Sequence, residues 1–317
     1  MKPRRKALIA GTLGTALATV GFAATAPERV LQAEYARQRW LAGAALHRVD
    51  VAGHRWSVLE AGDRAAKDKP LIVLVHGFVG SKENWLPVMR ELSRDYRLVA
   101  PDLPGWGESQ RIDGADYGPL AQTDRLALFL RTLDERPALV VGHSMGGQLV
   151  GLLASRHPEL VRRIGLMSSA GVTFEENAFA NAVLAGENPY QVTTKPELRR
   201  FLNIVFADPP FVPWPVDEAL VRRRRADRDF EQRVLDAIGR GPEALLLEQE
   251  LADIRAPALL LWCRDDKVID VSAAETFARG LRESTTVLLS GCGHMPLMAQ
   301  PKQVAEAVVS FVGSDPA

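Results

Sequence analysis

Short, nearly continuous apolar segments recur along the chain from residue 70 onward. This pattern is typical of strands that are buried on both faces of a parallel sheet. Amphipathic stretches of helical length, such as 82–96, 123–135 and 148–161, separate most of these segments. Alternation of this kind predicts a doubly wound α/β sheet with helices on both faces. The predicted strands lie in LIVLVHG (71–77), YRLVAPD (96–102), PALVVGH (137–143), RRIGLMSS (162–169), APALLLWC (256–263) and TTVLLSG (285–291).

Two regions depart from this alternation. Near the N-terminus, residues 28–46 have a helical pattern, and 47–62 alternate polar and apolar around Ala52-Gly53, which predicts an antiparallel hairpin. The interval 169–257 has no strand pattern, and a structureless connection of that length would be abnormal, so we predict an inserted helical cap. Open α/β sheets bind ligands beyond the carboxyl ends of their strands, and we expect the cap there. The predicted segments are a leader (1–26), a connecting helix (27–45), the first half of the core (46–170), the helical cap (171–250) and the second half of the core (251–317).

The first residues resemble an export signal. A basic start, MKPRRK, precedes the uncharged stretch Ala7 to Ala26, which ends in the small-x-small pattern Ala24-Thr25-Ala26. Pro27 would hinder a peptidase at that site, and the stretch is about the length that spans a bilayer. The sequence therefore predicts an exported protein, either cleaved and periplasmic or secreted, or anchored in the inner membrane and facing the periplasm. Membrane association through the N-terminus follows from the second alternative.

Composition argues against nucleic-acid partners and against a metal site. The 317 residues are 47% hydrophobic, and 39 basic residues balance 39 acidic ones, so nucleic-acid binding is not expected. The two cysteines, Cys263 and Cys292, are too few for a disulfide-built scaffold and belong to no Cys/His cluster. We therefore expect no metal site, and the sequence does not predict the oligomeric state.

Ser144 is the candidate nucleophile. It lies in the Gly-x-Ser-x-Gly motif GHSMG, which chance alone produces about 0.1 times in a chain of this length. The motif follows a predicted buried strand and opens a predicted helix, where Gly142 and Gly146 allow the chain to reverse sharply. Such a turn would hold the serine in a strained conformation and present its hydroxyl to a cleft. The alternative is a serine that merely caps the helix.

A serine nucleophile needs a base and an acid that orients it. His294 follows the last predicted strand in a glycine-rich loop, whereas the other histidines lie in the hairpin, in turns or at a helix end. Asp265 and Asp266 end the preceding strand, and the residue pattern does not choose between them. The order serine, aspartate, histidine is that of one fold among those that use this triad.

Hydrolysis also needs backbone N–H groups that bind the oxyanion. The turn HGF after an earlier strand and the helix start after Ser144 make the N–H groups of Phe78 and Met145 the expected donors. His76 and Gly77 would shape the first turn, with a structural role for His76.

Together, HGFVGSKENW, PDLPGWGES, GHSMGG, WCRDDKVI and GCGHMPL resemble the α/β-hydrolase family from about residue 46 to residue 312. Other segments, including ENPY and PPFVPWPV, are similar to bacterial lipases and esterases related to monoacylglycerol lipases. The resemblance implies an α/β-hydrolase fold and cleavage of acylglycerol or fatty-acid esters, with no cofactor. It also selects Asp266 as the acid, although Cys263 replaces the glycine that is usual in that loop.

The resemblance implies an acyl site in the cap. Apolar residues there include Phe174, Leu184 and Phe206, and the expected substrate-binding residues are Trp106, Phe179, Phe211 and Trp214. A small-ester esterase, a carbon–carbon bond hydrolase and an aminopeptidase of the same fold are the alternative functions, and a non-catalytic binding protein is a further one. Cys263 and Cys292 would end neighbouring strands; free buried thiols are the expectation, and a disulfide that clamps the acid and base loops is the alternative.

Overall fold

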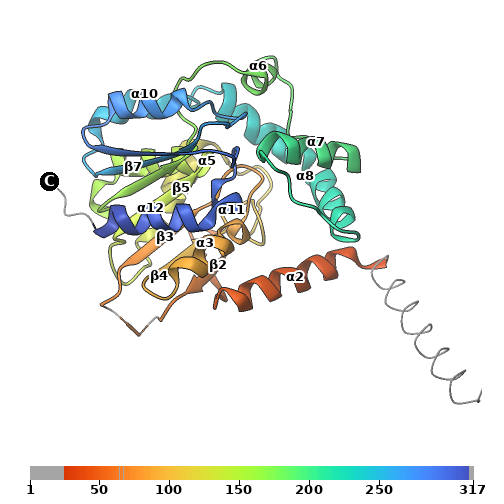
Figure 1. Cartoon of the computed structure of the whole chain (residues 1–317), viewed down its shortest axis with the longest axis horizontal. Coiled ribbons are helices and arrows are strands. Elements are labelled where there is room, and N and C mark those ends of the chain that lie inside the picture. The colour runs from red at the N-terminus through yellow and green to blue at the C-terminus, as the bar shows by residue number, and fades with distance from the viewer. Residues whose placement is uncertain (1–24, 64, 67, 314–317) are drawn as a thin grey trace, which may run out of the picture.

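In the described part of the chain, eight strands form one sheet in the order β1-β2-β4-β3-β5-β6-β7-β8. The structure is a computed structural model, and it describes residues 25–63, 65–66 and 68–313 (Figure 1). The strands are β1 (Ala45–Val51), β2 (His54–Ala61), β3 (Leu71–Val75), β4 (Arg97–Pro101), β5 (Leu139–His143), β6 (Ile164–Met167), β7 (Ala258–Cys263) and β8 (Ser284–Leu289). The hairpin β1–β2 and its neighbour β4 pair antiparallel, and every pairing from β4 to β8 is parallel. The mostly parallel sheet predicted from the apolar segments is confirmed.

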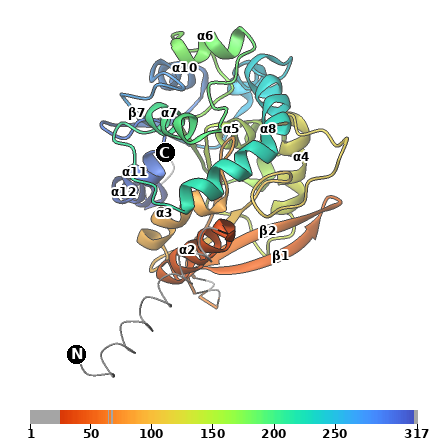
Figure 2. The same ribbon diagram turned by 90° about the vertical axis from the view of Figure 1, so that its right-hand side faces the viewer.

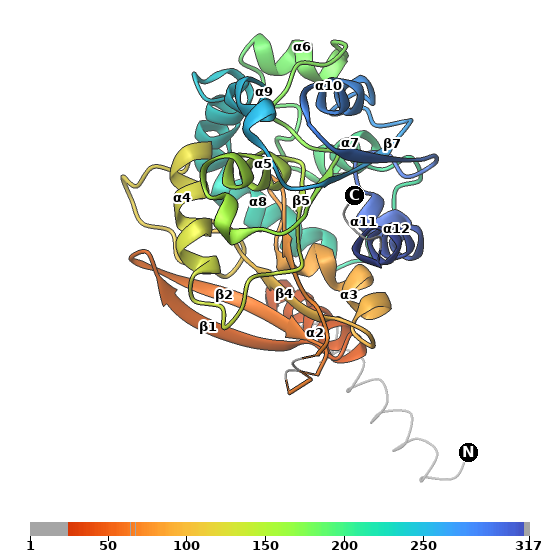
Figure 3. The same ribbon diagram turned by 90° about the vertical axis from the view of Figure 1, so that its left-hand side faces the viewer.

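Helices cover both faces of the sheet. In β3, Val73 and Val75 enter one apolar core while Ile72 and Leu74 enter another, because successive side chains point to opposite faces. Figure 3 shows α4 and α5 on one side of the strands and α3 and α12 on the other. The core helices are α3 (Leu86–Leu92), α4 (Pro119–Leu130), α5 (Met145–Arg156), α10 (Ser272–Gly280), α11 (Pro296–Ala299) and α12 (Pro301–Gly313), with short 3₁₀ turns η1 (Lys82–Trp85), η2 (Pro158–Leu160) and η3 (Leu251–Asp253).

The N-terminal helix α2 (Pro27–Leu41) ends earlier than predicted. The expectation of a helix to residue 45 or 46 was wrong, since β1 begins at Ala45. Gly43 adopts φ +61° and donates to Trp40 O, while the N–H of Ala44 donates to Arg39 O. This pair of bonds is a Schellman motif, which stops a helix at a glycine in the left-handed conformation. Gly43 was the signal in the sequence that the helical pattern obscured.

Between β6 and β7 the described chain forms helices and loops. The helices are α6 (Ala178–Leu184), α7 (Lys195–Val205), α8 (Val216–Arg240) and α9 (Leu246–Glu250). Figures 1 and 2 show α6, α7 and α8 grouped on one side of the core, with α2 running beneath α8. We refer to residues 171–250 as the cap segment. Helix α7 was not predicted individually, although Thr194 and Glu197 form the capping box that marks its start.

Most of the predicted leader lies outside the described residues. In the part of the chain that the structure describes, no helix is both long enough and apolar enough to cross a bilayer.

Candidate active site

Ser144 lies at the sharp turn between β5 and α5. Its backbone has φ 56° and ψ −121°, a conformation that a residue with a side chain rarely adopts. The flanking glycines are required for close packing. A Cβ on Gly142 would collide with the carbonyl of Gly146, and a Cβ on Gly146 would collide with the carbonyl of His76. The strand–turn–helix context predicted from the motif is therefore present, and the side chain of Ser144 is not used to cap α5.

Ser144, His294 and Asp266 form one continuous hydrogen-bonded chain. His294 Nε2 lies 3.0 Å from Ser144 Oγ, and His294 Nδ1 lies 2.8 Å from Asp266 Oδ2. Ser144, His294 and Asp266 are 8%, 2% and 5% exposed, so all three residues are buried. This geometry lets the imidazole accept the serine proton while the carboxylate stabilises the charged ring.

The two adjacent aspartates after β7 have different partners. Asp266 Oδ1 accepts the N–H groups of Val268 (2.8 Å) and Ile269 (3.1 Å), which leaves Oδ2 directed at His294. Asp265 instead accepts from the backbone of the loop after β8. The structure thus brings Asp266, and not Asp265, to the imidazole.

The two expected oxyanion donors flank Ser144. Met145 is the first residue of α5, and Phe78 follows the turn after β3. Among the hydrogen bonds of the described residues, neither backbone N–H has a protein acceptor. Gly77 brings the Phe78 turn close, because a Cβ there would lie 2.9 Å from Ser144 Cβ. Both N–H groups therefore remain available beside the serine.

His76 and His143 are buried beside the Phe78 and Ser144 turns, and each makes hydrogen bonds as a neutral ring. His76 Nε2 accepts the N–H of Leu103 at 3.0 Å, so its Nδ1–H donates to Gly77 O at 2.8 Å. His143 lies 2.7 Å through Nε2 from the carbonyl oxygen of His294. Burial lowers the pKa of His76, and burial together with the nearby His294 lowers the pKa of His143 well below its ordinary value. Both rings are therefore uncharged, which suits the hydrogen bonds they make.

A cavity of about 510 Å³ opens beside the serine. Ser144 and Phe78 lie in its wall, and the cap segment supplies most of the remaining surface. Apolar side chains dominate this wall, including Phe174, Phe179, Val183, Leu184, Leu235 and Ile238. A largely apolar cavity of this size suits an acyl chain.

The four expected substrate-binding residues lie in three different places. Phe179 lines the cavity. Trp106 is buried behind it, edge-on to the ring of Phe78 at 5.4 Å between centroids. Phe211 is 89% exposed and Trp214 is half exposed, both in the loop between α7 and α8, and neither lines the cavity. Aromatic residues in the cap were detectable from the sequence, but the direction of each side chain depends on helix packing that the sequence pattern does not encode.

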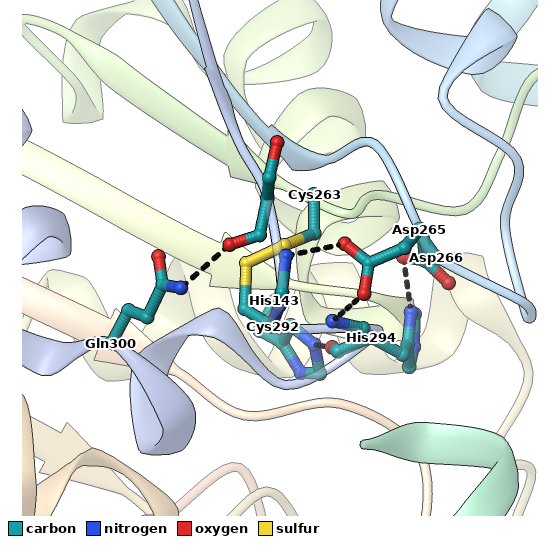
Figure 4. Close-up of a disulfide and its surroundings, with 10 residues drawn as sticks. His143, Cys263, Asp265, Asp266, Cys292, His294 and Gln300 are labelled. Carbon is teal, nitrogen blue, oxygen red and sulfur yellow. Dashed lines mark hydrogen bonds and ion pairs between the residues drawn. A yellow bond between two sulfur atoms is a disulfide. The ribbon is translucent and has the colours of Figure 1, made fainter. Parts of the chain in front are cut away.

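Cys263 and Cys292 form a disulfide, so the expectation of free thiols was wrong. Figure 4 shows the bond joining the end of β7 to the loop after β8, next to Asp265, Asp266 and His294. The pairing is possible because β7 and β8 are parallel neighbours, and Cys263 pairs with Leu289 at the end of the ladder. The two Cα atoms are 5.8 Å apart, within the usual range for a disulfide.

Behind the Phe78 turn lies a buried network of charges that sequence reasoning missed. Lys82 is completely buried, and its Nζ lies 2.7 Å from Asp102, 3.0 Å from Glu83 and 3.2 Å from Glu108. Arg39 of α2 also pairs with Glu83 and Glu108. Burial alone would lower the pKa of Lys82, but the carboxylates of Asp102 and Glu83 outweigh it and raise that pKa. Lys82 therefore stays charged inside the protein.

The charge network is connected to the Phe78 turn. Asp102 Oδ1 accepts the N–H of Lys82 at 2.7 Å, which fixes the chain just after that turn. The next residue, Leu103, donates to His76, and His76 in turn holds Gly77. Lys82, Asp102 and Glu108 stand in segments that carried the family resemblance, but nothing in their spacing indicates that they meet.

The described residues contain no group of three or more histidine, cysteine or acidic side chains that could hold a metal ion.

The chain is similar in sequence to a known protein family. Residues 72–307 match the model of the alpha/beta hydrolase family. Human monoacylglycerol lipase ABHD6 is 29% identical over 256 residues, covering 78% of this chain and 76% of the relative. A 2-hydroxy-6-oxo-2,4-heptadienoate hydrolase of Pseudomonas putida is 30% identical over 253 residues, covering 77% of this chain and 89% of the relative.

The fold is also similar to that of solved structures. A crystal structure of a membrane phospholipase A, described as a novel bacterial virulence factor, superposes with a TM-score of 0.86 at 32% identity. The alignment covers 97% of this chain and 98% of that one. The family match spans most of the chain and includes β3 to β8, the Ser144 turn and the loops of Asp266 and His294. The chain therefore belongs to the α/β-hydrolase family.

Proposed function

We propose that this protein is a carboxylic ester hydrolase that cleaves acylglycerols or fatty-acid esters through an acyl-enzyme on Ser144. The observation that carries the proposal is the hydrogen-bonded chain from Asp266 through His294 to Ser144, which ends at an apolar cavity. Relatives named as monoacylglycerol lipase and phospholipase A support an acyl ester as the substrate.

In the proposed mechanism His294 Nε2 removes the proton from Ser144 Oγ as the oxygen attacks the ester carbonyl. The N–H groups of Phe78 and Met145 bind the oxyanion of the tetrahedral intermediate, each contributing about 3 to 4 kcal/mol. Asp266 holds the imidazole and stabilises its positive charge. His294 then gives the proton to the leaving alcohol, and the same residue activates the water that hydrolyses the acyl-enzyme.

The cap segment supplies the acyl site in this proposal. Phe179 and the other apolar residues of the cavity wall would contact the acyl chain. Trp106 would not contact the acyl chain directly but would hold the ring of Phe78 in place. Phe211 and Trp214 would contact substrate only outside the cavity.

The test is hydrolysis of nitrophenyl esters and monoacylglycerols of graded chain length by the wild type and by Ser144→Ala. We expect the wild type to prefer medium or long chains and the variant to lose at least about 10⁴-fold in kcat. A variant with unchanged activity would remove Ser144 from the mechanism, and a preference for acetate would indicate a small-ester esterase.

The heptadienoate hydrolase relative favours carbon–carbon bond hydrolysis as a second candidate. The name of that relative gives a carboxylate as its substrate, and a protein site normally binds a carboxylate through a positively charged side chain. Among the described residues that line the cavity, Arg240 is the basic one, and it already pairs with Asp236 at 2.9 Å. We therefore rank ester hydrolysis first. Turnover of a 2-hydroxy-6-oxo dienoate faster than of every ester would reverse that order.

We also propose that the protein is exported. Disulfides persist mainly in oxidising compartments, so the bond between Cys263 and Cys292 agrees with the basic and then uncharged N-terminal sequence. N-terminal sequencing of membrane and soluble fractions tests this proposal. Intact Met1 in the membrane fraction would indicate an anchor, and a start at Pro27 a cleaved signal.

A further inference from the structure

Asp265 contacts the loop that carries His294, although it does not touch the imidazole. Its Oδ1 accepts the N–H of Gly291 at 2.8 Å, and its Oδ2 accepts the N–H of Gly293 at 3.2 Å. Between these two residues the N–H of Cys292 donates to Cys263 Sγ at 3.0 Å. Three consecutive N–H groups therefore point at the segment that also holds Asp266. Figure 4 shows both aspartates and the disulfide around His294.

The loop needs such anchors because its sequence is intrinsically flexible. Gly291 and Gly293 both adopt the left-handed conformation, with φ of +77° and +60°. Glycine has the largest number of accessible backbone conformations, so a loop with two of them costs more entropy to fix. On the opposite side the N–H of His294 donates to Val205 O at the end of α7. A Cβ on Gly293 would lie 2.8 Å from that same carbonyl oxygen.

We propose that Asp265 is a positioning residue for His294, and that it shares this role with the Cys263–Cys292 disulfide. The inference rests on the proposed function, in which His294 is the base. The carboxylate fixes the two glycine N–H groups on the acid loop, and the disulfide fixes the residue between them. Together they hold the imidazole within reach of both Asp266 and Ser144. Loss of one anchor loosens the loop, and loss of both frees it.

The disulfide acts as a permanent anchor in this proposal. Cys263 and Cys292 are both 0% exposed. Thiol–disulfide exchange requires access of a thiolate to a sulfur atom, and burial prevents that access in the folded protein. The contribution of the bond is therefore tested by substitution.

The experiment compares Asp265→Asn, the double substitution Cys263→Ala/Cys292→Ala, and the combined variant of the full chain. Asparagine keeps the shape of the side chain but turns an amide N–H₂ toward one of the two glycine N–H groups. Asp270→Asn is the matched control, because Asp270 lies on the same loop and accepts from Ser272 N at 2.9 Å. The measurements are kcat and KM on the best nitrophenyl ester, and the thermal midpoint by circular dichroism.

Misplacement of a reacting group by about 1 Å can cost about 100-fold in rate, and a partly anchored loop should lose less. We expect roughly tenfold lower kcat for Asp265→Asn, with KM within about twofold and Asp270→Asn unchanged. The combined variant should lose more than the product of the two separate losses, because each anchor compensates for the other. All rates are compared at a temperature at which circular dichroism shows every variant folded.

A second measurement does not depend on ester turnover. The Nδ1–H of His294, bonded to Asp266, should give a strongly downfield proton signal in histidine-labelled wild type. We expect that signal to weaken in Asp265→Asn and to vanish in the combined variant. Unchanged kcat and an unchanged signal in Asp265→Asn would overturn the inference, as would a loss confined to KM. If the wild type gave the signal but hydrolysed no ester, the proposed function would fail while the positioning role was still decided by the signal.

Discussion

The two sides of Ser144 are held by different kinds of interaction. The turn that carries Phe78 depends on a buried network of charges, with Lys82 among three carboxylates and Arg39 arriving from α2. The loops of Asp266 and His294 depend on a disulfide and on hydrogen bonds to neutral backbone groups. The first side therefore responds to the loss of a charge, and the second to the loss of a covalent bond.

The two sides also differ in how far along the chain their partners lie. Cys263 and Cys292 are 29 residues apart, at the ends of adjacent strands β7 and β8. Arg39 lies 44 residues from Glu83 and 69 from Glu108, and it belongs to the helix that follows the predicted leader. The disulfide of the acid–base side thus joins two adjacent strands, whereas the ion pairs of the oxyanion side include a residue of the N-terminal helix. Substitutions that weaken the contacts of α2 should therefore disturb the position of Phe78 more than that of His294.

The largest expected effect is that of Lys82→Met. The substitution keeps the length of the side chain but leaves Asp102, Glu83 and Glu108 without their buried cation. Removing one partner of a buried ion pair typically costs about 3 to 5 kcal/mol. We expect that loss in the free energy of unfolding, measured by urea titration at pH 7. Lys302→Met, at an exposed position of α12, should change it by less than about 0.5 kcal/mol. Equal stability of the two variants would contradict a structural role for the network.

Replacing both cysteines by alanine should have the next largest effect. A disulfide that closes a loop of 29 residues stabilises the fold by about 3.5 kcal/mol in the chain-entropy model, because it restricts the unfolded state. The same urea titration measures the loss. Wild-type protein unfolded in the presence of a reducing agent should have the same midpoint as the variant. A variant as stable as the oxidised wild type would show that the bond does not constrain the unfolded chain.

Arg39→Met tests whether α2 contributes to the oxyanion side. Arg39 is largely buried and pairs with Glu83 and Glu108. Its loss should therefore lower the free energy of unfolding, measured by the same urea titration, by about 1.5 to 2 kcal/mol. Arg37→Met is the matched control on the same helix. Arg37 pairs with Glu34 at the exposed surface, where solvent screening leaves an ion pair with little effect on stability, so Arg37→Met should be nearly as stable as the wild type. A smaller loss for Arg39→Met than for Arg37→Met would show that α2 and the network are not coupled.

Much of this site was predictable because its chemistry follows strand ends. Ser144, Asp266 and His294 each follow a strand of the parallel sheet, and parallel strands bring their carboxyl ends to one edge. The strands themselves were predictable because apolar runs buried on both faces leave a clear signal. The residues alone left Asp265 and Asp266 undecided, since both stand at the same strand end and differ only in the direction of their side chains.

The supporting interactions were not predictable in the same way. The ion pairs of Arg39 join residues far apart in sequence, and a charged residue on a helix is ordinarily solvated. The disulfide depends on β7 and β8 being neighbours in register, which apolar patterns do not specify. The exposed positions of Phe211 and Trp214 depend on how α7 and α8 pack. Each of these features is set by tertiary contacts and not by local periodicity.

The smallest expected effect concerns pH and His143, a buried histidine whose ring contacts the carbonyl oxygen of His294. His143 is neutral in the folded protein because burial lowers its pKa, whereas in the unfolded chain it binds a proton near pH 6.5. As pH falls through about 6.5 the unfolded state therefore binds up to one more proton than the folded state, and stability falls. Well above that pH the group has no effect on stability.

His143→Gln removes the titration, and its amide N–H₂ can still donate to His294 O. The free energy of unfolding of wild type and variant should differ in slope by up to about 1.4 kcal/mol per pH unit between pH 6.5 and 5.5. The two curves should run parallel above pH 7. If the two stability curves stayed parallel down to pH 5.5, His143 would be taking up a proton inside the folded protein. The loops around His294 would then contain a buried charge, as the network behind the Phe78 turn does.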